Sequence, residues 1–96
     1  MNATELRQHV TNYENTRLIY MNFSVDERGI WGLAEGEKTQ YLLTDEKVND
    51  YKTFLQAAIQ NYTNLIRFFS NDLQIEKKLK KYKLYTKRLE SAISKI

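Results

Sequence analysis

The side chains that could bind a metal or a phosphate are few in this sequence, and their spacing is unfavourable. His9 is the only histidine, four residues after Glu5 on a predicted helix. Two ligands do not make a zinc site, and no cysteine is present to complete one. The segment GLAEGEKT (Gly32 to Thr39) has the glycines and lysine of a phosphate-binding loop, but Glu37 stands where that motif needs glycine directly before the lysine. We therefore expect no metal site and no nucleotide site.

General acid–base catalysis also lacks a suitable group of residues. The carboxylate pairs Asp26/Glu27 and Glu35/Glu37 fall in predicted turns, where solvent would surround them. Catalytic carboxylates need a cleft that removes water and shifts their pKa, and a chain of 96 residues is small for building one. The sequence predicts that the protein is not an enzyme and has no cofactor.

Positive charge at the end of the chain is the strongest chemical signal. Residues 76–96 hold eight Lys or Arg and two Asp or Glu, whereas residues 1–75 hold seven and ten. On a helix over 73–96, Leu84 faces away from the apolar stripe, between Lys80 and Lys87. The predicted partner-binding residues are Lys77, Lys80, Lys81, Leu84, Lys87, Arg88 and Lys95.

An apolar centre ringed by cations suits an acidic protein surface, or a nucleoprotein partner, better than free duplex nucleic acid. The expected function is a small non-enzymatic binding protein, a regulator or inhibitor that acts through a helical hairpin with a basic outer face. The alternatives are direct nucleic-acid binding by the basic helix, an enzyme, and a face that is merely solvated. The small size weakly suggests a virus or a mobile element as the source.

The elements that must position these residues begin with a helix over 45–69. Its apolar residues recur at steps of three and four, a heptad-like stripe. The stripe comprises Val48, Tyr51, Leu55, Ala58, Tyr62, Leu65 and Phe69, widened by Phe54, Ile59, Ile66 and Phe68. So wide an apolar face predicts that this helix is covered on two sides.

A second helix is predicted over 73–96. Its buried stripe is expected to be Ile75, Leu79, Tyr82, Thr86, Leu89, Ile93 and Ile96. The residues Ser70, Asn71 and Asp72 between the stripes favour a helix start, with Asn71 and Gln74 as a capping box, and the stripe changes phase there. We therefore expect an antiparallel hairpin, with one rod of about 50 residues as the alternative.

The N-terminal half predicts a short helix over 3–15 and a three-stranded antiparallel meander over 18–43. IYMNFSV alternates apolar and polar residues, as a half-buried strand does. Trp31 is expected to plug the core beneath the meander. The fold class is thus α+β and helix-dominated, in a single domain over 1–96, with an all-α chain as the alternative.

Cellular setting and assembly follow from composition alone. No stretch approaches the roughly 18 apolar residues of a membrane span, no secretory signal is apparent, and the chain has no cysteine. We expect a cytoplasmic protein without membrane contact. Self-association into a homodimer is expected as well, because small domains often bury leftover apolar surface by pairing.

Overall fold

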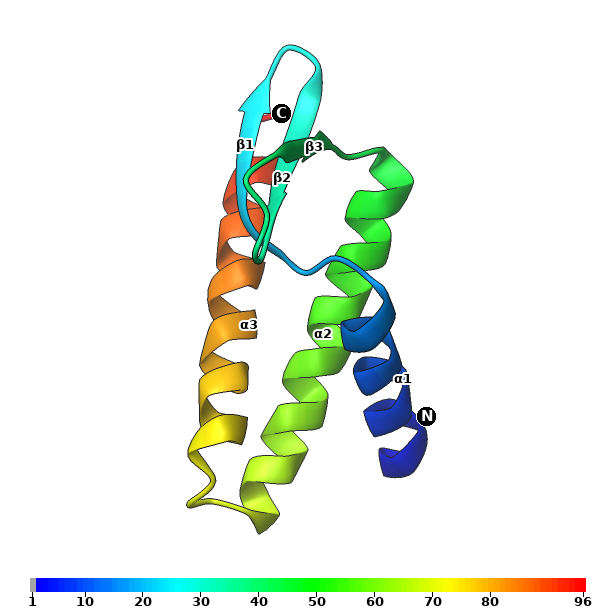
Figure 1. Ribbon diagram of the computed structural model, residues 1–96, viewed down its shortest axis with the longest axis vertical. Coiled ribbons are helices and arrows are strands. Elements are labelled where there is room, and N and C mark those ends of the chain that lie inside the picture. Colours follow the sequence, from blue (N-terminus) through cyan, green and yellow to red (C-terminus); the bar gives the residue numbers. More distant parts are fainter. Residues whose placement is uncertain (1) are drawn as a thin grey trace.

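The computed structural model describes residues 2–96 and shows a helical hairpin beside a small sheet and a short helix (Figure 1). The elements are α1 (Ala3–Thr16), β1 (Tyr20–Asp26), β2 (Gly29–Ala34), β3 (Gln40–Leu42), α2 (Asp45–Phe68) and α3 (Leu73–Ile93). The predicted helix-dominated α+β fold and its element order are confirmed. Both alternatives, the all-α chain and the single rod, are wrong.

The break between α2 and α3 has a clear local cause. Phe69 N donates to Leu65 O at 2.9 Å and closes α2. The Asp72 carboxylate then accepts from the backbone of Gln74 (2.9 Å) and Ile75 (3.3 Å), so it caps the free N–H groups that open α3. The cap is Asp72 rather than the predicted Asn71.

The sheet is antiparallel in the order β1-β2-β3, and its close approach to the core depends on a glycine. Gly32 on β2 lies between Tyr20 and Leu43. A Cβ at this position would stand 2.7 Å from Tyr20 Cδ1 and 3.0 Å from Leu43 Cδ1. Only glycine leaves room for both side chains, which is why β2 runs so near its neighbours.

The core of the hairpin is aromatic. Leu55 is fully buried, and Tyr51, Phe54 and Tyr82 are each 1% exposed. Phe54 stacks on Tyr13 of α1 with ring centroids 4.0 Å apart and meets Tyr82 edge-on at 5.5 Å. α2 is therefore covered by α1 on one side and by α3 on another, as its wide apolar face predicts.

The buried side of α3 differs from the predicted stripe. Tyr82 and Leu89 are buried as expected, but the other buried residues are Tyr85 and Ala92. The remaining members of the stripe, Ile75, Leu79, Thr86 and Ile93, are only half-buried, and Ile96 is exposed. The physical reason is β1, which packs against one flank of α3 and turns the buried side toward the sheet.

Trp31 is not the core plug that the sequence predicted. Cross-strand pairing of Trp31 with Ser24 and Leu42 places it on the sheet face opposite Ile30, which is buried. There Trp31 is half-buried. Its indole N–H, beside the Asp26 carboxylate, lowers the pKa of that group, although the contact falls short of full hydrogen-bond geometry.

Candidate partner-binding surface

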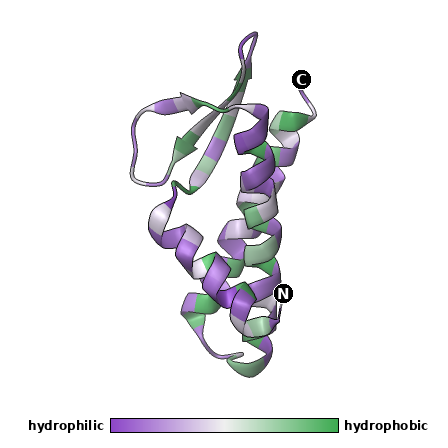
Figure 2. Ribbon diagram, turned by 90° about the vertical axis from the view of Figure 1, so that its right-hand side faces the viewer, coloured by the Kyte–Doolittle hydropathy of each residue, from purple (hydrophilic) through white to green (hydrophobic). Residues whose placement is uncertain are grey.

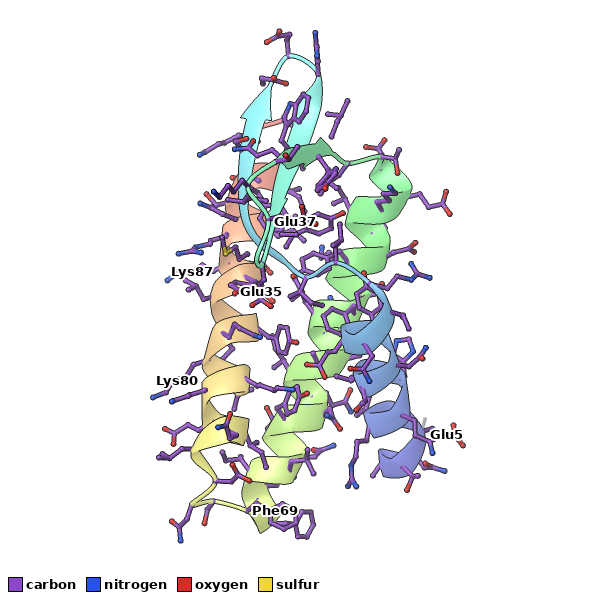
Figure 3. All side chains as sticks on the ribbon, in the orientation of Figure 1. Glu5, Glu35, Glu37, Phe69, Lys80 and Lys87 are labelled. Carbon is purple, nitrogen blue, oxygen red and sulfur yellow. The ribbon has the colours of Figure 1, made fainter. Side chains whose placement is uncertain are left out.

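The outer side of α3 carries a concentration of positive charge. Leu73–Ile93 contains seven Lys or Arg residues and two glutamates. Leu84 is 44% exposed on this side, and Lys80 and Lys87 are exposed beside it. Figure 3 shows Lys80 and Lys87 pointing away from α2. The predicted apolar centre and two of its cations thus lie together on the surface.

The other two cations around Leu84 are held by the chain itself. Lys81 Nζ lies 3.2 Å from the Glu35 carboxylate, in the loop after β2. Arg88 Nη1 donates to the backbone carbonyl of Met21 on β1 at 2.7 Å. Because β1 packs on this flank of α3, Lys81 and Arg88 line the sheet-side edge of the surface instead of projecting freely.

Lys77 is exposed near the start of the same side. Lys95, by contrast, follows the end of α3 and lies beside Val25 of β1, away from the other predicted lysines. Lys80 pairs with Glu76 at 3.2 Å, four residues back on the helix, and its side chain is 76% exposed. Such an exposed pair contributes little to stability and is easily exchanged for another partner. We name the set Lys77, Lys80, Leu84 and Lys87 the basic outer face, with Lys81 and Arg88 at its edge.

A half-buried carboxylate ties α1 to both helices of the hairpin, and the sequence did not predict it. Glu14 of α1 accepts hydrogen bonds from the hydroxyls of Tyr62 (2.8 Å) and Tyr82, and Lys78 Nζ lies 3.4 Å away. Burial, and then the Glu14 carboxylate, raise the pKa of both tyrosines above the ordinary value. The two phenols therefore stay protonated at neutral pH and act as donors that tie α1 to the hairpin.

An apolar cluster at the turn of the hairpin was also missed. Phe68 is 80% exposed, Leu73 67% and Phe69 55%, although the sequence analysis assigned both phenylalanines to the buried side of the helix. The assignment is wrong because the last turn of α2 extends past α1 in the described part of the chain, and both side chains are left in solvent there (Figure 1). The available signal was two adjacent phenylalanines directly before the Ser-Asn-Asp turn.

The apolar tip and the basic outer face are parts of one surface. Leu73 and Leu84 are eleven positions apart, which is three helical turns, so both point the same way from α3. Leu84 in turn lies between Lys80 and Lys87, one turn away on either side. A continuous strip thus runs from the tip along α3, with apolar side chains at two points and lysines around them.

The molecule also has a cleft away from the outer side of α3. It measures about 650 Å³ and opens between the β1–β2 turn, the start of α2 and the end of α3. Within residues 2–96, no three His, Cys, Asp or Glu side chains gather as a metal site would require. None of the three helices described is long and apolar enough to cross a membrane.

No protein-family model matches the chain, and no curated protein or solved structure matches it at a significant level.

Proposed function

We propose that this protein is a small non-enzymatic binding protein, a regulator or inhibitor, whose basic outer face holds an acidic protein partner. The observation that carries the proposal is Leu84, a large apolar side chain left 44% exposed among lysines on a stable helix. A solvated helix face has no need of a leucine at its centre. A contact surface does, because apolar anchors supply affinity while surrounding charges supply steering and specificity.

The charge of the surface decides the kind of partner. Seven cations against two carboxylates along α3 would repel a second basic surface and attract an acidic one. Lys77 and Lys87 are exposed, and Lys80 is held only by its exposed pair with Glu76, so all three can adapt to carboxylates at different positions. Lys81 and Arg88, held against Glu35 and Met21, form a more rigid border.

The hairpin tip extends the same contact. Phe68, Phe69 and Leu73 expose a compact apolar area of about 400 Å², the size of patch that often marks a binding site on a small protein. An interface normally needs about 800 Å² from each partner. The tip is therefore an anchor within a larger contact, to which the basic outer face contributes the remainder.

Nucleic-acid binding is the second candidate, because of one specific feature. Lys77, Lys80, Lys83 and Lys87 recur along α3 over about 15 Å, a spacing along which several phosphates could be contacted. The exposed leucines argue for the protein partner, since a phosphate backbone offers them no apolar contact.

The test is affinity capture from cells of the native host with three matched variants, each run with and without nuclease. Leu84→Ala should weaken capture about tenfold, the effect of losing a contact worth about 1.4 kcal/mol. Lys80→Glu with Lys87→Glu should abolish it. Lys38→Glu with Lys47→Glu, which changes the net charge equally at exposed positions away from α3, should bind as the parent does.

Two outcomes would decide against the proposal. If the variant Lys80→Glu with Lys87→Glu binds like the parent, the basic outer face is only the solvated side of a helix whose other side is buried in the core. If capture is lost on nuclease treatment, and the purified protein binds a DNA or RNA duplex with a steep dependence on salt, the nucleic-acid function replaces it.

A further inference from the structure

The hairpin has a second surface, on the side turned away from the sheet, that the chain leaves half covered. Lys81 and Arg88 point to the sheet. Leu79 lies two positions before Lys81, and Thr86 two positions before Arg88. Leu79 and Thr86 therefore project about 200° around α3 from the side that faces the sheet. On α2, Phe54 faces α1, and Asn61, seven positions later, shares its side of the helix. Ile59 and Ile66 each lie five positions after one of these residues, so they project about 140° around α2 from the side that faces α1. We name this surface the back face. Its members are Ile59, Thr63 and Ile66 on α2, and Ile75, Leu79 and Thr86 on α3, all half-buried.

The back face is the place where the observed packing departs from the sequence pattern. Its three α3 residues all belong to the predicted buried stripe, but β1 packs on the other flank of α3 and turns the covered side that way. The side view shows the sheet to one side of the two long helices (Figure 2). The apolar side of α2 and α3 is therefore wider than the area that the other elements of the chain cover.

Charge along the edges of the back face is balanced, unlike that of the basic outer face. Lys52 and Lys83 border it, and so do Glu76 and Glu90. A copy of the same chain can approach such a surface without net repulsion. The basic outer face, by contrast, would repel its own copy.

We propose that the occupant of the back face is a second copy of this chain, and that two hairpins pack back to back as a four-helix bundle. α2 has 24 residues and is about 36 Å long, and two helices side by side are about 20 Å wide. The outline of the face is thus about 700 Å², so a second hairpin can lie along its full length.

The position of the charges indicates the direction of the symmetry axis. Tyr62 stacks on Tyr82 with ring centroids 5.9 Å apart, so these residues share a level along the hairpin. Because α2 and α3 run in opposite directions, Lys52, ten residues before Tyr62, and Glu90, eight residues after Tyr82, lie at similar levels, about 12–15 Å further toward the sheet. A two-fold axis parallel to the helices lays α2 of one copy over α3 of the other and sets Lys52 against Glu90 of the second copy.

This assembly is independent of the proposed function. The basic outer face lies on the far side of α3 from α2, at the edge of such a bundle, and stays accessible in both copies. Two copies would then present two basic outer faces. The dimer can exist without an acidic partner, and the partner can bind without the dimer.

The experiment is analytical ultracentrifugation of the purified full chain from low to high micromolar concentration. We expect a monomer–dimer equilibrium in the parent. Thr63→Lys with Thr86→Lys should raise the dissociation constant by more than tenfold. Both sites are polar and half-exposed, and lysine has a better helix propensity than threonine, so circular dichroism should show the fold retained.

Charge variants separate this dimer from other forms of association. Lys52→Glu should weaken the dimer, and adding Glu90→Lys should restore it. Lys80→Glu with Lys87→Glu, which targets the basic outer face, should leave the equilibrium unchanged. A parent that stays monomeric at high micromolar concentration would overturn the proposal. So would a dimer that survives Thr63→Lys with Thr86→Lys but dissociates on Phe68→Ser with Phe69→Ser.

Discussion

Glu14 shows how one side chain can determine the arrangement of three helices. It sits on α1, yet its carboxylate accepts from tyrosines of both α2 and α3 and lies 3.4 Å from Lys78 Nζ. The Glu14 side chain is only 12% exposed, so a charge is kept from water and must be compensated by these donors. Hydrogen bonds to a charged group are stronger than those between neutral groups, and here they converge from two different helices.

Glu14→Ala should destabilise the fold by about 1–3 kcal/mol, because it leaves the hydroxyls of Tyr62 and Tyr82 without their acceptor. Urea unfolding followed by circular dichroism measures the change. Gln8→Ala on the same helix is the matched control, since Gln8 is exposed, and should fall within about 0.5 kcal/mol of the parent. A loss at Glu14 no larger than at Gln8 would mean that the carboxylate does not hold the helices together.

The sheet decides the orientation of α3 at the scale of elements. β1 packs on α3, and two hydrogen bonds join the sheet to this helix. Arg88 donates to the Met21 carbonyl of β1, and the Tyr85 hydroxyl donates to the Glu35 carboxylate, which follows β2, at 2.6 Å. The consequence is that α3 buries Tyr85 and Ala92 and leaves Leu79 and Thr86 half-covered. The basic outer face and the back face both owe their positions to this rotation.

Gly32→Ala should test the packing of the sheet on the core. The added Cβ would meet Tyr20 Cδ1 at 2.7 Å, so one of them must move, at a cost of about 1–3 kcal/mol. Ser24→Ala on the exposed side of β1 serves as the control and should cost less. Thermal unfolding of the two variants compares them, and equal melting temperatures would contradict the close approach of β2 to Tyr20.

The whole molecule separates its charge and its apolar surface into distinct regions. It is elongated, 45 Å by 24 Å by 24 Å, with the sheet at one end and the apolar tip at the other. Between them run the basic outer face on one side of α3 and the charge-balanced back face on another. A partner protein and a second copy would therefore occupy different surfaces.

Stability of the whole fold should fall in alkali. Burial raises the pKa of Tyr51, Tyr62, Tyr82 and Tyr85 above the ordinary 10.0. Below pH 10 these phenols are protonated in both states, and their contribution is complete. Above it the unfolded chain releases protons that the folded chain retains, so the free energy of unfolding falls as pH rises, by about 1.4 kcal/mol per pH unit for each fully buried phenol.

Urea unfolding between pH 8 and pH 11 measures this dependence. Tyr51, 1% exposed, donates to the Tyr20 carbonyl at 2.7 Å and should contribute fully. Tyr51→Phe should be less stable at neutral pH, because the Tyr20 carbonyl loses its donor. Its free energy of unfolding should, however, fall less steeply above about pH 10, because unfolding of the variant releases one proton fewer. An unchanged slope would show that Tyr51 ionises equally in both states.

Local interactions explain why the sequence alone determined the elements. Heptad spacing from Val48 to Leu65, alternation in the first strand and the polar turn between the long helices each depend on neighbours within a few residues. The exposure of Leu84 and Lys80 also followed from helical spacing alone. These features needed no knowledge of how the elements meet.

Only the tertiary structure decided which sides of the elements are covered. The sequence pattern placed Trp31, Phe69 and Thr86 in the core. In the structure Phe69 is 55% exposed, and Trp31 and Thr86 are only half-buried. The reason is that periodicity identifies an apolar side but not the element that covers it. The positions of Lys81 and Arg88 were settled in the same way, by contacts with residues 46 and 67 positions earlier in the chain.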